Sequence, residues 1–208
     1  MVKLYYTPSS CGASNFIAAF VAGVTIDCET VELSTHLTAS GVDFYTINPK
    51  GNVPCLVLDD GTILNENAAT LQYIADLAPG KVAPVNGTVD RALVQNALSY
   101  ISGELHGSIG PLFNPTISAD VRAFSLSKVD AKLKYINDTL VKGKTFVVGD
   151  QFSVADAYLY IVLTWEPYAK FDTSPYPNVK AYFEGIKALP FIQAAHKAMG
   201  NSPATTAN

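Results

Sequence analysis

The sequence has few cysteines, few charges and no excess of positive charge. Its 208 residues include three cysteines, 14 Lys and Arg against 18 Asp and Glu, and only 15% charged residues. Nucleic-acid binding needs a basic face, and a chain with a net charge of −4 does not supply one. We therefore expect no nucleic-acid partner. The 49% hydrophobic content is typical of a compact, slightly acidic globular protein.

Long apolar runs are also lacking. No stretch approaches the roughly 20 apolar residues that span a bilayer, and the opening MVKLYYTPSS has no signal-peptide core. We expect a cytoplasmic protein with no membrane partner. Cys11, Cys28 and Cys55 have no metal-ligand spacing such as Cys-x-x-Cys, so we predict no metal site. A structural disulfide is not expected in a reducing compartment.

The first 78 residues alternate strand-like runs with helical patterns. Strands are indicated by β-branched and aliphatic runs, two of them joined by the tight turn Asp-Asp-Gly, and helices by apolar residues at helical spacing. In chain order the patterns fall at residues 2–6, 11–24, 26–33, 40–49, 54–64 (a hairpin) and 65–78. The order β-α-β-α-β-β-α predicts a domain at residues 1–78 with a mixed four-stranded sheet covered by helices.

The rest of the chain is helical in pattern. Residues 79–87, PGKVAPVNG, are rich in Pro and Gly and are predicted to form a linker. Long helices are expected over 88–112 and 118–141, and a tail from residue 200 is expected to fray. The segment 152–165 is apolar on every side and begins with a capping-box spacing, so it must lie in the middle of a bundle. We predict an all-helical domain over 88–208.

Five stretches, in order and with matching spacing, carry a resemblance to a known family. They are KLYYTPSSC, INPKGNVPCLVLDDGTIL, QYIADLAP, ELHGSIGPLF and FSVADAYLY. Together they resemble the cytosolic glutathione transferases, and most closely the bacterial beta class, over nearly the whole chain. The resemblance implies a thioredoxin-like glutathione-binding domain, a helical domain with a hydrophobic-substrate site, and a cytoplasmic homodimer. The activity it implies is detoxification by conjugating the thiol of glutathione, a co-substrate, to small hydrophobic electrophiles.

Cys11 is the first candidate catalytic residue. It stands where the first predicted helix begins, and the unpaired N–H groups and positive dipole end of a helix favour thiolate over thiol. Ser14 occupies the position of a dithiol oxidoreductase's second cysteine, so internal disulfide chemistry is excluded and a mixed disulfide with glutathione is not. We predict a reactive thiol. The alternative is a small buried residue with no chemical role.

Two further catalytic residues follow from the resemblance. Tyr6 resembles the tyrosine whose phenol donates a hydrogen bond to the glutathione thiolate, with core packing as the alternative. His106 resembles the beta-class histidine that faces the thiol across the cleft, where an imidazole could hydrogen-bond the sulfur or relay a proton. The alternative for His106 is a structural histidine on a half-buried helix.

The resemblance also implies contacts along the glutathione peptide. Val53-Pro54 resembles the cis-proline turn, whose valine pairs with the backbone of the cysteinyl residue. Glu66 is expected to bind the ammonium group, and the helix start at Asn67 the neighbouring α-carboxylate. Glu66 could instead be an ordinary acid at a helix start.

The remaining implied contacts lie at the ends of the glutathione site. His36 and Asn52 match positions that reach the glycyl end, and Glu104 matches a residue that contacts glutathione from the neighbouring subunit. A plain surface role is the alternative for His36 and Glu104. For the second substrate, an apolar pocket is expected from aromatic residues that could equally be ordinary core. They are Tyr6, Phe113, Trp165 and Tyr168.

Other functions fit parts of the same pattern. One is thiol–disulfide exchange through a Cys11–glutathione mixed disulfide, and another is a glutathione-dependent isomerase or biosynthetic transferase. A non-enzymatic ligand-binding protein on the same scaffold is a third. The joint presence of Cys11, Val53-Pro54, Glu66 and His106 argues against this third function, because binding alone needs no reactive sulfur.

Overall fold

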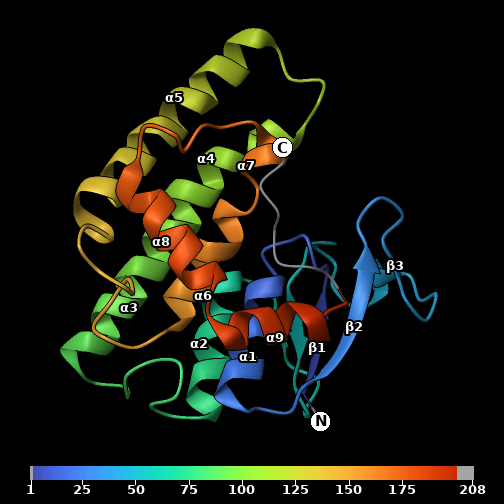
Figure 1. Ribbon diagram of the computed structural model, residues 1–208. Coiled ribbons are helices and arrows are strands. Elements are labelled where there is room, and N and C mark those ends of the chain that lie inside the picture. Colours follow the sequence, from blue (N-terminus) through green and yellow to red (C-terminus); the bar gives the residue numbers. More distant parts are fainter. Residues whose placement is uncertain (1, 201–208) are drawn as a thin grey trace.

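The computed structural model describes residues 2–200, which form an α/β part and a helical part (Figure 1). The sheet has the strand order β3-β2-β1-β4-β5, with β1 parallel to β2 and every other neighbouring pair antiparallel. The strands are β1 (Lys3–Tyr6), β2 (Asp27–Glu32), β3 (Leu37–Thr38), β4 (Cys55–Val57) and β5 (Ile63–Leu64). The thioredoxin-like architecture is confirmed. All four predicted strands are present, and β3 adds an edge strand too short to show a pattern in the sequence.

The helices of the α/β part are α1 (Ala13–Ala22) and α2 (Asn67–Leu77). The helix predicted at 40–49 is reduced to one 3₁₀ turn, η1 (Phe44–Thr46). It is short because Gly41 before it has a φ of 83° and a proline follows at position 49. The turn begins at Asp43, whose side chain accepts a hydrogen bond from the Tyr45 N–H.

The helical part begins with a helix that changes type along its length. The elements are α3 (Val89–Tyr100), the π-helical η2 (Ile101–His106), α4 (Gly107–Ile109), the 3₁₀ turn η3 (Gly110–Phe113), α5 (Ala119–Tyr135), the π-helical η4 (Ile136–Leu140), α6 (Val154–Leu163), α7 (Glu166–Ala169), α8 (Pro177–Lys187) and α9 (Pro190–Ala198). The sequence predicts one uninterrupted helix over 88–112, whereas the structure has a π-helical segment in its middle. Such segments are frequent at functional sites.

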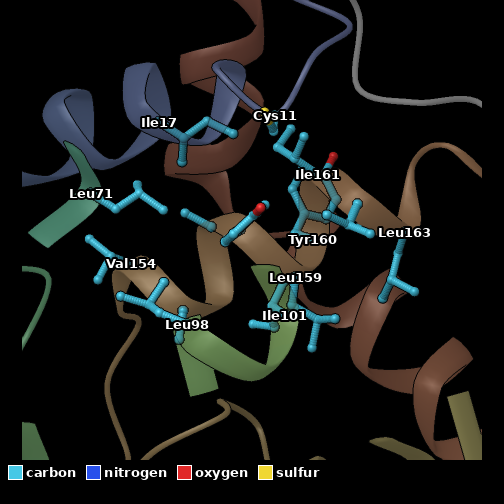
Figure 2. Packing of buried hydrophobic residues seen from close by; sticks show 14 of the residues in the cluster. Cys11, Ile17, Leu71, Leu98, Ile101, Val154, Leu159, Tyr160, Ile161 and Leu163 are labelled. Carbon is cyan, nitrogen blue, oxygen red and sulfur yellow. The ribbon is translucent and has the colours of Figure 1, made fainter. Parts of the chain in front are cut away.

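Helix α6 occupies the centre of the molecule. All ten of its residues are buried, as its uniformly apolar sequence predicts, and Ser153 and Asp156 form the predicted capping box. Figure 2 shows Ile17 and Leu71, from α1 and α2, on one side of α6 and Leu98 and Ile101 on the other. The two parts therefore share the larger hydrophobic core. A smaller cluster lies within the α/β part and consists of Tyr5, Val31, Phe44, Val53 and Cys55.

The last helix returns to the α/β part. Helix α9 packs against α1, and the two lie side by side in Figure 1. The segment predicted as a linker, 79–87, is tied to α6 by a hydrogen bond from the Val154 N–H to the Val82 carbonyl, 2.8 Å long. The expected fraying of the tail concerns residues that lie outside the described part of the chain, apart from Gly200.

Candidate active site

A cleft with a volume of about 720 Å³ opens between the α/β part and the helical part. Its lining residues are Ser9, Ser10, Cys11, Leu33, Gly51, Asn52, Val53, His106, Phe113, Trp165 and Tyr168. Seven of these were predicted as site residues from the sequence, and they come from segments far apart in the chain. The walls are joined directly, because the Trp165 Nε1–H donates to the Ser9 carbonyl at 2.9 Å.

Cys11 lies in the turn that leads from β1 into α1. Gly12, which caps the helix, allows this turn to approach the strand closely: a Cβ at that position would lie 2.9 Å from the Cβ of Tyr6. The Cys11 side chain is 7% exposed and belongs to the shared core cluster (Figure 2). Its Sγ–H donates to the Val53 carbonyl at 3.5 Å. The sulfur thus forms the floor of the cleft.

Burial opposes the expected thiolate at Cys11 in the free protein. Burial raises the pKa of the Cys11 thiol to about 12, although the Cys11 and Gly12 N–H groups at the helix start act in the predicted, lowering direction. The negative charge of Glu66 adds to the increase. Burial outweighs the helix start because it removes water from the sulfur, and loss of hydration penalises the charged form. Cys11 is therefore a neutral thiol at physiological pH.

The Val53-Pro54 peptide bond is cis, as the resemblance implies. The Val53 carbonyl receives only the weak S–H bond from Cys11, and no hydrogen bond of the Val53 N–H is found within residues 2–200. Val53 is one of the residues that line the cleft. An extended peptide lying along this segment would find a donor and an acceptor available.

His106 lines the cleft from the helical part, opposite Cys11. Its Nδ1 lies 2.7 Å from the hydroxyl oxygen of Tyr158, and its ring contacts the Trp165 ring edge-on with centroids 4.8 Å apart. Burial lowers the pKa of His106, because it disfavours the charged imidazolium. A neutral imidazole thus faces a neutral thiol.

The predicted aromatic residues form one wall of the cleft. Phe113 and Trp165 meet edge-on with centroids 5.4 Å apart, and Trp165 is nearly buried. Phe113 and Tyr168 are 46% and 71% exposed, so both leave apolar surface facing the opening. A small apolar molecule held against this wall would lie beside the Cys11 sulfur.

Tyr6 does not reach the cleft. It is 4% exposed, its ring stacks on Phe16 with centroids 5.5 Å apart, and burial raises its pKa to about 12. The structure therefore corrects the expectation of a phenol beside the thiol and supports the packing alternative. Strand alternation sends Tyr5 to the other face of the sheet, where it packs against Phe44.

Glu66 and Asn67 lie at the start of α2, outside the residues that line the cleft. Glu66 is exposed and forms an ion pair with Lys50, with Nζ and Oε1 2.6 Å apart. The Asn67 side chain points inward, where Nδ2 donates to Ser14 Oγ at 3.2 Å and Oδ1 accepts from Asn15 Nδ2 at 2.5 Å. Only backbone N–H groups at this helix start remain for an anion.

Of the two residues predicted at the glycyl end of glutathione, His36 lies outside the cleft and Asn52 lines it. His36 has a φ of 54°, and its Nε2 is 3.2 Å from the Tyr45 hydroxyl, so the histidine does not line the cleft. Asn52 does line it, and Asn48 Nδ2 holds the Asn52 carbonyl at 2.7 Å. Pro54, which follows Val53, is buried and does not line the cleft.

Glu104 also lies outside the cleft. Its carboxylate pairs with Lys132, with Oε2 and Nζ 2.5 Å apart, and this contact lowers the pKa of Glu104. Glu104 and Lys132 line a separate hollow of about 320 Å³ between η2, α4 and α5, which also includes Phe124. Within a single chain Glu104 therefore has no contact with the cleft.

Two features of the site were missed from the sequence. Tyr158 lies in a helix that the sequence predicts as apolar core, yet a buried tyrosine hydroxyl needs a hydrogen-bond partner, and this rule marks Tyr158 as a candidate. The other is the bond from Trp165 to Ser9, for which the sequence gives no signal, because the partner is a backbone carbonyl 156 positions away.

No helix within residues 2–200 is long and apolar enough to cross a membrane. In the same part of the chain, no group of three or more His, Cys, Asp or Glu side chains is arranged to hold a metal ion.

Comparisons with known proteins identify the family of this architecture. Residues 9–77 match the model of the glutathione S-transferase N-terminal domain, and residues 100–190 match that of the C-terminal domain. The chain is 34% identical to glutathione S-transferase GstA of Escherichia coli O157:H7, over 96% of this chain and 99% of that protein.

Solved structures agree over the same length. A glutathione transferase from Methylococcus capsulatus str. Bath superposes with a TM-score of 0.91 at 42% identity, covering 96% of this chain and 99% of the other. A sphingomonad glutathione S-transferase in complex with glutathione and the beta-class enzyme of Sphingomonas chungbukensis each give a TM-score of 0.88 at 38% identity, covering 95% of this chain and 98% of the other.

Proposed function

Because the chain belongs to the glutathione S-transferase family, we propose that it joins the glutathione thiol to small apolar electrophiles in the cleft between its two parts. The single observation that carries this proposal is the meeting of Cys11, Val53 and His106 with the aromatic wall of Phe113, Trp165 and Tyr168 around one opening. One side offers peptide-binding groups and the other an apolar surface. Such a division suits a reaction between a polar peptide and an apolar partner.

Glutathione would lie in extended form along the cis-proline segment. The Val53 N–H and carbonyl would pair with the backbone of its cysteinyl residue, and the N–H groups at the start of α2 would hold its α-carboxylate. Glu66 would bind the ammonium group, which then takes the place of Lys50 in the present ion pair. At the glycyl end, Asn52 lines the cleft. His36, held by Tyr45, would contribute only if its ring turned towards the ligand.

The sulfur of glutathione would then lie between Cys11 and His106. Both groups are neutral, and each can donate a hydrogen bond to a thiolate without carrying a charge itself. Hydrogen bonds to the charged form lower a pKa, so these donors would favour loss of the glutathione S–H proton to solvent. The thiolate then attacks the electrophilic carbon, and the S–C bond forms as the leaving group departs with its electron pair.

Thiol–disulfide exchange through Cys11 is disfavoured as the main activity. The attacking species in such exchange is the thiolate, and burial raises the pKa of the Cys11 thiol far above neutral pH. Conjugation needs only the glutathione thiolate, so the burial of the Cys11 thiol does not slow it. An isomerase or a dedicated biosynthetic transferase would use the same activated sulfur.

The proposal includes a cytoplasmic homodimer. Glu104 is exposed and turned away from the cleft of its own chain, which suits a contact with glutathione bound by a second copy. The measurement is the mass in solution by light scattering, followed by the glutathione KM of Glu104→Gln. A monomeric mass with full activity would remove this part of the proposal.

Activity measurements test the central proposal. The wild type is expected to bind immobilised glutathione and to conjugate glutathione to an aryl halide. Cys11→Ser is compared in conjugation and in reduction of a glutathione mixed disulfide, with Cys28→Ser, which removes an exposed thiol outside the cleft, as the matched control. We expect Cys11→Ser to retain most of the conjugation. A wild type that neither binds glutathione nor conjugates it would refute the proposal.

A further inference from the structure

We propose that Tyr158 is a positioning residue for His106: its hydroxyl donates to Nδ1 and fixes the tautomer that presents Nε2–H to the cleft. Tyr158 lies on the central helix α6, is 1% exposed, and places its oxygen 2.7 Å from His106 Nδ1. The two rings meet edge-on with centroids 5.9 Å apart. The catalytic meaning of this tautomer rests on the proposed function, whereas the tautomer itself does not.

The polar side chains beside this pair have defined donor and acceptor roles, starting at Cys11. The Cys11 carbonyl can only accept, so the Ser14 hydroxyl donates its one hydrogen to that oxygen, at 2.6 Å. Ser14 Oγ must then accept from the nearest atom of Asn67, at 3.2 Å. This atom is therefore the amide nitrogen, Nδ2.

A second contact fixes the same orientation of Asn67. Its Oδ1 accepts from Asn15 Nδ2 at 2.5 Å, so the amide nitrogen of Asn67 faces Ser14. The side chains of Asn67 and Ser102 lie near the Tyr158 oxygen, where both oppose the increase that burial causes in the Tyr158 pKa. Within residues 2–200, His106 Nδ1 is the one atom at hydrogen-bond distance from the buried Tyr158 hydroxyl. If Nδ1 carried a proton and donated it, the phenol hydrogen would have no acceptor, so the hydroxyl donates to Nδ1.

An imidazole that accepts at Nδ1 carries its proton at Nε2 when neutral. His106 Nε2 makes no hydrogen bond to any of residues 2–200, and the residue lines the cleft together with Cys11. The titratable groups that face the ring are the Tyr158 phenol and the Cys11 thiol, both uncharged near neutral pH. His106 thus acts as a hydrogen-bond donor to a sulfur in the cleft and not as its base.

Nuclear magnetic resonance of the ring nitrogens tests the tautomer in the free protein. Long-range ¹H–¹⁵N spectra distinguish protonated from unprotonated nitrogens, and we expect unprotonated Nδ1 and protonated Nε2 for His106. In Tyr158→Phe we expect a mixture of both tautomers at His106. The matched control is Tyr160→Phe, which removes another buried hydroxyl from the same helix, one that lies 3.0 Å from His196 Nε2. It should alter the signals of His196 alone.

Kinetics give the second readout. Tyr158→Phe is expected to lower kcat for conjugation about tenfold while leaving the KM for glutathione unchanged, because it disturbs an interaction made with the developing thiolate. Tyr160→Phe should leave both unchanged. A protonated Nδ1 in the wild type, or an unchanged His106 spectrum in Tyr158→Phe, would overturn the inference. A wild type with the expected spectrum but no conjugation would refute the proposed function and leave the tautomer assignment standing.

Discussion

The protonation of Cys11 gives the sharpest prediction, because its pKa decides which chemistry the cysteine can perform. Burial raises the pKa from an ordinary 9.0 to about 12. This difference of about three pH units corresponds to an about thousandfold smaller thiolate fraction at neutral pH. Since alkylating reagents react with the thiolate, we expect Cys11 to react far more slowly than free glutathione at pH 7.5.

The assay is alkylation by iodoacetamide at a series of pH values, with the Cys11 peptide quantified by mass spectrometry. Limited access would lower the rate equally at every pH, whereas a raised pKa moves the pH at which the rate levels off. We expect the Cys11 rate to rise about tenfold per pH unit up to at least pH 10, while glutathione in the same tube levels off earlier. A Cys11 rate that levels off below pH 8 would refute the argument and restore the reactive thiolate predicted from the helix start.

Three further predictions concern stability and binding. Gly12→Ala should lower the free energy of unfolding by about 1–3 kcal/mol, because the added Cβ would lie 2.9 Å from the Cβ of Tyr6. Denaturant titration measures this change. The control is Gly103→Ala, whose added Cβ would have no other atom within 4 Å. Glu66→Gln should raise the glutathione KM about fivefold, as expected for an exposed ion pair, and an unchanged KM would show that Glu66 does not bind the ammonium group. The free energy of unfolding should fall above about pH 9, because the unfolded chain then loses the Cys11 proton while the folded chain keeps it up to about pH 12. A melting temperature that stays constant over this pH range would contradict the buried thiol.

Most of the fold could be predicted from the sequence because its signals are local. The capping box at Ser153 depends on residues three positions apart, and the burial of α6 follows from an apolar sequence with no polar side. The position of Cys11 before α1 follows from strand and helix patterns alone. The two-residue strand β3 and the 3₁₀ turn at Phe44–Thr46 were beyond such reasoning, since neither is long enough to have a period.

The chemistry of the site was harder to predict, because burial comes from distant segments. The helix start lowers the pKa of Cys11 as expected, but the core shared with α6 raises it by more, and no local pattern reports that packing. Tyr6 was placed at the right end of its strand, yet its partner Phe16 holds the ring in the core. Asn67 likewise turns inward because Ser14 and Asn15 bind its side chain.

The shared core has a consequence for engineering new specificity. With α9 lying on α1 and α6 packed between the two parts, the helical half cannot be exchanged for that of another enzyme without also matching the surface it rests on. Separate expression of the α/β half would expose to water the apolar side chains that it packs against the helical half. Changes of substrate range are therefore best sought by substituting Phe113 and Tyr168. Both rings are exposed, so they can be replaced without disturbing the shared hydrophobic core.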